Sequence, residues 1–99
     1  MRTIPIAAVP NQNLTATIGT NRWTITLKVA VTSMIADVLL NDQPIVLGQR
    51  IAVGTPIIPY DYLSLDGNFI LLVDGEDLPD WQKFGVSQQL VYVTPDELP

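Results

Sequence analysis

The chain has 99 residues, of which 47% are apolar and 15% charged, and it contains neither cysteine nor histidine. These absences exclude disulfide bonds, thiol and imidazole catalysis, and the usual zinc and haem ligands. The formal net charge is −5 and unevenly spread, because residues 1–60 carry four basic and two acidic side chains, whereas residues 61–99 carry one basic and eight acidic ones. Scattered basic residues do not form a phosphate-binding face, so we expect no nucleic-acid partner.

Size and hydropathy bear on the setting of the protein. We expect residues 1–99 to form a single domain, because two separate cores would each be too small to be stable. The mean hydropathy of +0.29 is high for so few charges and predicts apolar contacts within an assembly. No apolar run is long enough to span a bilayer, and Pro5 and Pro10 interrupt the first one. We therefore expect a chain without a signal peptide or membrane span, made in the cytoplasm.

The N-terminal region predicts an edge strand followed by a hairpin. Residues 3–8 can pair only as an edge or first strand, because Pro5 lacks an amide hydrogen. Residues 13–31 alternate apolar and polar side chains on both sides of Gly19-Thr20-Asn21, which predicts a β-hairpin closed by a short loop. The second arm has five apolar side chains on one face: Trp23, Ile25, Leu27, Val29 and Val31.

The remainder of the chain predicts shorter extended segments separated by turns. An aliphatic run over residues 34–40 ends at the turn-forming pair Asn41-Asp42, and residues 44–53 resume extended structure with a bulge or bend at Gly48. After this segment the sequence predicts an irregular crossing over residues 54–62, a turn at 66–68 and a strand over 69–73. A polar loop over residues 74–80 and a helical turn over 80–84 follow. The chain then continues with a last strand over 90–94 and an acidic tail over 95–99.

Turn signals recur about every ten residues, and no segment shows a helical apolar stripe over three turns. The sequence therefore predicts an all-β fold: a single small antiparallel β-barrel or sandwich with a short helical turn near residues 80–84. Residues 1–12 are expected to form an extended N-terminal segment of this domain.

No catalytic constellation is present. The hydroxyls of Ser33, Ser64 and Ser87 have no histidine to deprotonate them, and a serine–lysine pair with Lys28 or Lys83 is the remaining alternative. Lys28 alternates with core residues and should point to solvent. We assign no catalytic and no cofactor-binding residue and expect the protein not to be an enzyme.

The acidic loop over residues 74–80 has three interpretations. Asp74, Glu76, Asp77 and Asp80 supply the oxygen ligands that calcium prefers, but their spacing matches no EF-hand. Docking to a basic partner is the second interpretation, and a solvated turn that serves solubility is the third. We favour the turn and assign no metal ligand.

Two aromatic features differ in their expected environment. Trp23 opens a strand and is expected in the core. Trp81 and Phe84, beside the acidic loop, could cover the domain's own barrel mouth or anchor the chain in a partner.

A series of short motifs runs in order over nearly the whole chain: Arg2-Thr3-Ile4-Pro5-Ile6, Pro10-Asn11-Gln12, Trp23-Thr24-Ile25-Thr26-Leu27, Pro44-Ile45 with Gly48, Arg50-Ile51, Val53-Gly54, Asp74-Gly75 with Pro79, Leu90-Val91-Tyr92-Val93 and Asp96-Glu97-Leu98. Taken together, these motifs resemble the baseplate plug proteins of contractile-tailed bacteriophages. Residues 34–40 depart from the pattern, where an aromatic residue and a more polar outer face are expected.

The resemblance implies a structural protein of the virion, without a reaction of its own. Such a plug is expected at the tail tip, bound to the baseplate hub below the tail tube and to neighbouring tail proteins in a symmetric hetero-oligomer, where it helps to assemble and close the baseplate. The alternative is a cellular β-barrel module that recognises a peptide or a carbohydrate.

Partner contacts are predicted in two places. The N-terminal segment contains two prolines, packs poorly as an autonomous strand, and is suited to adding to a neighbour's sheet. The predicted partner-contact residues are Ile4, Pro5, Ile6, Pro10, Asn11, Gln12, Trp81 and Phe84.

Overall fold

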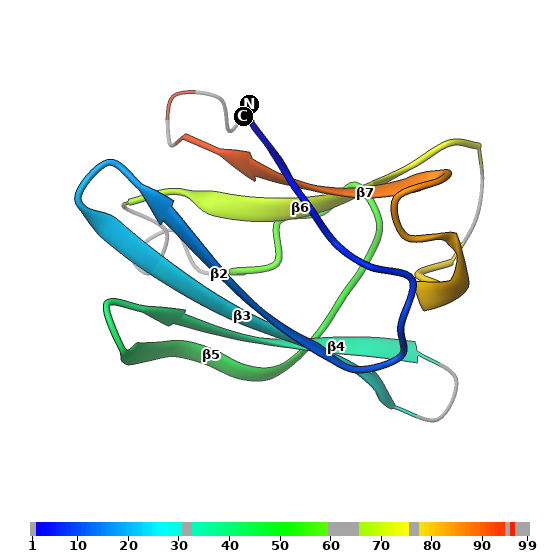
Figure 1. The fold of residues 1–99 in the computed structure, drawn as a ribbon, viewed down its shortest axis with the longest axis horizontal. Helices are drawn as coiled ribbons and strands as arrows, with labels where there is room; N and C mark the ends of the chain where they lie inside the picture. Colours follow the sequence, from blue (N-terminus) through cyan, green and yellow to red (C-terminus); the bar gives the residue numbers. More distant parts are fainter. Residues whose placement is uncertain (1, 31–32, 60–65, 76–77, 95, 97–99) are drawn as a thin grey trace.

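The computed structural model describes residues 2–30, 33–59, 66–75, 78–94 and 96, and it is built almost entirely from strands (Figure 1). The elements of this part of the chain are β1 (Arg2–Ile4), β2 (Gln12–Ile18), β3 (Asn21–Ala30), β4 (Ser33–Leu40), β5 (Gln43–Arg50), β6 (Asn68–Val73), the 3-10 helix η2 (Trp81–Lys83) and β7 (Gln88–Val93). All strand pairs are antiparallel. The all-β prediction is confirmed.

Strands β2 to β5 form one sheet in the order β2-β3-β4-β5. The predicted hairpin over residues 13–31 is present, with Gly19-Thr20 as a two-residue turn in which Gly19 has φ 63°. Strands β4 and β5 are joined by Asn41-Asp42, whose φ values of 51° and 68° fit a type I′ turn. Both turns use residues that tolerate the left-handed region, which explains why local sequence specified them.

The second sheet combines the first strand with the last, in the order β1-β7-β6. Arg2 pairs with Tyr92 and Ile4 with Leu90, so the pairing joins the two ends of the chain. Strand β1 lies at the edge and ends before Pro5. The prediction of an edge strand is therefore confirmed, although the strand is shorter than the predicted residues 3–8.

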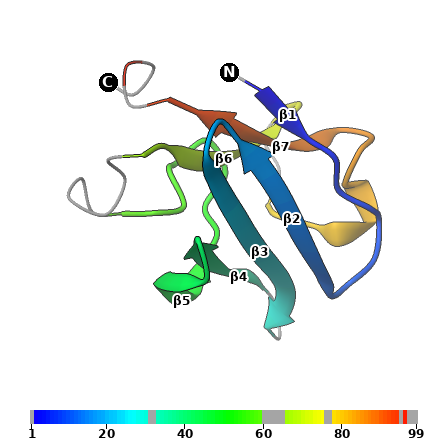
Figure 2. The same ribbon diagram turned by 60° about the vertical axis from the view of Figure 1, so that its left-hand side comes forward.

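The two sheets pack face to face around one cluster of buried side chains (Figure 2). At its centre the ring of Trp23 meets Phe69 edge-on, with centroids 5.1 Å apart, and Phe69 meets Tyr92 at 5.5 Å. Within the described residues β1 is not a hydrogen-bonded neighbour of β2. The described strands thus form an open sandwich, the second of the two predicted architectures, and not a closed barrel.

The predicted inward face of β3 is confirmed over most of its length. Trp23, Ile25 and Leu27 are buried. Val29 is 39% exposed, contrary to prediction. It pairs with Met34 of β4, but β2 begins opposite Leu27, so no residue of β2 lies beside Val29 on the other side. Val31 lies outside the described residues.

Most shorter predictions are also confirmed. The run over residues 34–40 is β4, and Gly48, with φ 66°, accompanies the register shifts between β4 and β5. The predicted helical turn is η2, capped by Asp80, whose Oδ1 accepts a hydrogen bond from the Gln82 amide at 3.0 Å. Residues 60–62 of the predicted crossing, and residues 95 and 97–99 of the predicted acidic tail, lie outside the described residues.

A buried asparagine attaches an irregular segment to the second sheet. Asn68 is 1% exposed, and its Oδ1 accepts hydrogen bonds from the amides of Ile58 at 2.9 Å and Phe69 at 2.8 Å. Its Nδ2 donates to the carbonyl oxygen of Ile58 at 2.8 Å. One side chain therefore satisfies both backbone groups of Ile58, which lies in no strand.

Two glutamines repeat this arrangement elsewhere. The amide of Gln12 accepts a hydrogen bond from Ala7 N–H at 3.0 Å and donates to Ala7 O at 2.7 Å. The amide of buried Gln88 accepts from Asp80 N–H at 2.9 Å and donates to Leu78 O at 2.8 Å. We call Gln12, Asn68 and Gln88 the amide clamps, because each fixes a loop by imitating the paired backbone groups of a strand.

Candidate partner-binding surfaces

The two groups of predicted contact residues come together at one end of the sandwich. The segment that leaves β1 and the turn that contains η2 lie side by side in both ribbon views (Figures 1 and 2). A Cβ atom added at Gly85 would lie 3.5 Å from the carbonyl oxygen of Ile6. We call the exposed parts of residues 5–11 and 81–86 the end surface. Sequence reasoning named both segments but could not show that they meet.

The predicted contact residues differ widely in exposure. Ile4 and Phe84 are 4% and 2% exposed and belong to the protein's own core. Ile6 and Trp81 are half-buried and pack against that core. Trp81 and Phe84 therefore pack largely against the protein's own core, which is one of the two environments expected for this pair.

The polar members of the N-terminal motif make hydrogen bonds within the chain. Asn11 Oδ1 accepts from the amide of Val29 at 3.3 Å, and Gln12 is one of the amide clamps. Pro5, Pro10 and Asn11 are exposed. Contact with a partner stays a prediction for all these residues.

Sequence reasoning missed two apolar side chains at the end surface. Val86 is 78% exposed and follows η2, and Val9 is 40% exposed within the N-terminal segment. Neither belongs to an alternating pattern, so their exposure had no sequence signal. Among residues 5–11 and 81–86 the only charged side chain is Lys83, although the chain as a whole carries −5. An apolar patch with little charge is typical of the centre of a protein–protein interface.

The acidic loop does not assemble a metal site within the described residues. Asp74 is exposed, and Asp80 is committed to capping η2. No group of three carboxylates in the described part of the chain is placed to hold an ion. Glu76 and Asp77 lie outside it.

One acidic residue in the first sheet has a specific electrostatic environment. Asp37 Oδ2 accepts a hydrogen bond from Lys28 Nζ at 2.7 Å across the β3–β4 pair. Asp37 Oδ1 accepts from the amide of Gly48 at 2.6 Å. The hydrogen bond from Lys28 first, and then that from Gly48, lower the pKa of Asp37 below its usual value of 3.8. Lys28 is thus engaged in an ion pair with Asp37.

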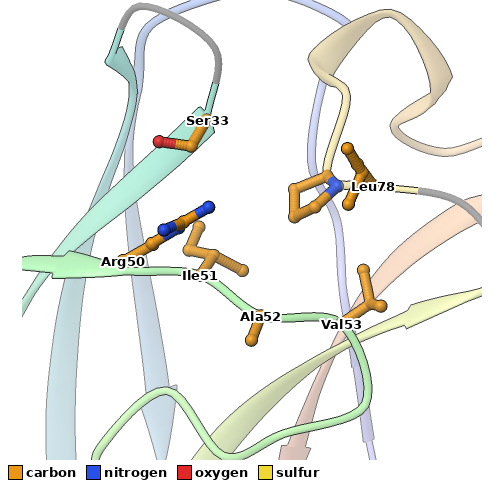
Figure 3. Close-up of a pocket in the computed structure, with 7 residues that line it drawn as sticks. Ser33, Arg50, Ile51, Ala52, Val53 and Leu78 are labelled. Atoms are coloured by element: carbon orange, nitrogen blue, oxygen red, sulfur yellow. The ribbon is translucent and has the colours of Figure 1, made fainter.

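A small apolar pocket lies between β4, the end of β5 and residues 78–79 (Figure 3). Its volume is about 260 Å³, and Arg50, Val53 and Leu78 are among the lining residues. The hydroxyl of Ser33, at its rim, donates to the carbonyl oxygen of Ala30 at 3.3 Å. Among the described lining residues there is no acid or base that could activate this hydroxyl.

Comparison with known protein families identifies the chain. A family model described as "Cyanophage baseplate Pam3 plug gp18" matches residues 1–96. The chain belongs to this baseplate plug family. A search of curated proteins found no match.

Membership of the baseplate plug family settles the broad class of the protein. It is a structural protein of a bacteriophage virion, located in the tail baseplate, where it associates with other baseplate proteins. No helix in the described ranges is long and apolar enough to cross a membrane. The resemblance drawn from the sequence motifs is thus confirmed, whereas the cellular binding module receives no support.

Proposed function

We propose that the chain is a non-catalytic plug that binds the baseplate hub below the tail tube through the end surface, and so helps to assemble and close the baseplate. The observation that carries this proposal is the meeting of residues 5–11 and 81–86 at one end of the sandwich, with exposed apolar side chains and little charge. Burying Val86 and Val9 against a partner would remove apolar area from water without desolvating an ion.

The architecture supports rigid presentation of this surface. The side chain of Gln12 fixes residues 5–11 at Ala7. Residues 81–86 are fixed by the Asp80 cap and by the hydrogen bond that the Gly85 amide donates to the backbone carbonyl oxygen of Gln88. A preorganised surface loses little conformational entropy on binding, because its loops are ordered beforehand. This suits a permanent structural contact better than a transient one.

The proposal includes the setting of the protein. We treat residues 1–99 as one domain, which the single buried cluster shared by the two described sheets supports. Several copies join the hub and neighbouring tail proteins in a symmetric hetero-oligomer, after synthesis in the host cytoplasm. The protein catalyses no reaction.

A pair of matched substitutions tests the end surface. Val86→Asp places a charge at its centre, whereas Leu47→Asp places one on β5, where Leu47 is 66% exposed. An unpaired charge that is buried in an interface lowers the affinity, so Val86→Asp should weaken binding to purified hub by about tenfold or more. Leu47→Asp should leave binding almost unchanged.

Binding is measured by biolayer interferometry on immobilised hub, and thermal unfolding of both variants checks that they fold. Equal affinities for the two folded variants would show that the end surface is not the hub contact.

A further inference from the structure

Strand β2 has a free edge whose backbone groups are regularly arranged. The two-residue turn makes Ile18 and Asn21 a hydrogen-bonded pair, so Thr17 and Arg22 form a non-hydrogen-bonded one. A hydrogen bond of Arg22 supports this assignment. Its carbonyl oxygen accepts from the Asn41 amide at 2.8 Å and therefore points away from β2. The same alternation directs the N–H and C=O groups of residues 13, 15 and 17 away from β3. Among the described strands, β3 is the only neighbour of β2.

The other three sheet edges are protected. Strand β1 has three residues and ends at Pro5, and β5 carries Pro44 and the bulge at Gly48. The edge of β6 is covered by residues 54–57, whose Gly54 and Ile57 amides donate to carbonyl oxygens of β6 at 2.9 and 2.8 Å. Strand β2 has seven residues, no proline, no charge and no register shift against β3. Such an edge invites pairing with another strand.

A groove lies along this edge. It runs between β1 and β2, has a volume of about 590 Å³, and is lined by residues 2–5 and 13–17. Leu14 and Ala16 point to the core side of the sheet but are only half-buried, whereas Trp23 and Ile25 on the next strand are fully covered. An added strand would continue the sheet and complete the burial of Leu14 and Ala16.

The charge of the groove indicates the chemistry of the occupant. Arg2 is its only charged lining residue, and within the described residues it has no ion-pair partner. None of the chain's own edge strands β1, β2, β5 and β6 contains an aspartate or glutamate. Two copies of the chain joined through these edges would therefore leave Arg2 unmatched.

From these observations we infer that the groove accepts an extended segment of another baseplate protein, which adds as a strand to the edge of β2. The segment places apolar side chains over Leu14 and Ala16 and an acidic side chain at Arg2. The identity of the partner rests on the proposed baseplate function, but the strand-accepting edge does not.

Amide hydrogen exchange tests the inference without any substitution. The amides of residues 13, 15 and 17 should exchange quickly in the isolated chain and at least about a hundredfold more slowly in purified baseplates, because a hydrogen-bonded strand closes them from water. The amides of Leu14 and Ala16, bonded to β3, serve as controls and should be protected in both samples. Fast exchange of the three edge amides in baseplates would overturn the inference, and concentration-dependent protection in the isolated chain would show a second copy as the occupant.

Substitutions separate this site from the end surface. Thr15→Pro removes an edge N–H, and Thr15→Lys blunts the edge with an exposed charge, so both should weaken binding to baseplate proteins by about tenfold or more. Arg2→Glu should do the same, whereas Arg50→Glu, at the end of β5, should not. If Thr15→Lys binds normally while Val86→Asp does not, the strand-accepting groove is wrong and the proposed function stands. Normal binding of Arg2→Glu would overturn the acidic character of the occupant.

Discussion

Replacing Asn68 by alanine isolates the energetic role of the amide clamps. The substitution removes the hydrogen bonds to Ile58 N–H, Ile58 O and Phe69 N–H. Ile58 is 2% exposed, so its amide and carbonyl would be left without partners in an apolar environment. A buried polar group without a partner costs about 1–3 kcal/mol, so the two groups of Ile58 predict a loss of roughly 2–6 kcal/mol in the free energy of unfolding. This is a large share of the ~5–15 kcal/mol typical of native proteins.

Asn13→Ala is the matched control. Asn13 lies on the exposed face of β2, where its Nδ2 donates to the hydroxyl of Thr26 at 3.1 Å. Water can replace this hydrogen bond, so the control should lose no more than about 0.5–1 kcal/mol. Urea unfolding followed by tryptophan fluorescence gives both values, since Trp23 is buried in the native state. Losses within about 0.5 kcal/mol of each other would refute the reasoning and show that the segment around Ile58 rehydrates freely.

Two further predictions concern the first sheet. Leu27→Ala should lower the free energy of unfolding by roughly 2–4 kcal/mol, because Leu27 is buried. Thr26→Ala, on the outer face of β3, should lower it by far less. Equal losses in urea unfolding would mean that the inward face of β3 is misassigned. Because the pKa of Asp37 is lowered on folding, this residue stabilises the folded protein at pH values above its unfolded pKa of about 4. This added stability is lost as the pH falls through the folded pKa. As the pH falls from about 5 through the folded pKa, Asp37→Asn should therefore lose less stability than the wild type. Parallel curves in acid-unfolding experiments would contradict this.

Local chemistry allowed the hairpin over residues 13–31 and the turn at Asn41-Asp42 to be predicted from the sequence. The alternation in residues 13–31 and the turn pair Asn41-Asp42 act over a few residues, so the hairpins follow from them directly. The second sheet could not be predicted in the same way. Its pairing of Arg2 with Tyr92 joins residues at opposite ends of the chain, and no local pattern encodes that choice.

The candidate surfaces were predictable only as separate segments. The motifs around Pro5 and Trp81 drew attention to two parts of the end surface, but their proximity depends on the β1–β7 pairing. The burial of Asn68 and Gln88 could not be predicted from the sequence. Asparagine and glutamine are mostly exposed in proteins, and the role of these two side chains depends on backbone groups elsewhere in the chain. The free edge of β2 likewise becomes apparent only once the order of strands in both sheets is known.

The pairing of β1 with β7 also bears on when the protein becomes competent to bind. During synthesis β1 leaves the ribosome long before its partner, Gln88–Val93, has been made. The meander from β2 to β5 can form on the growing chain, whereas the second sheet must wait until β7 has been made. The groove between β1 and β2 and the end surface beside η2 both depend on that late step. A chain cut short before β7 would therefore lack both proposed surfaces, and we expect such a chain not to bind its baseplate partners.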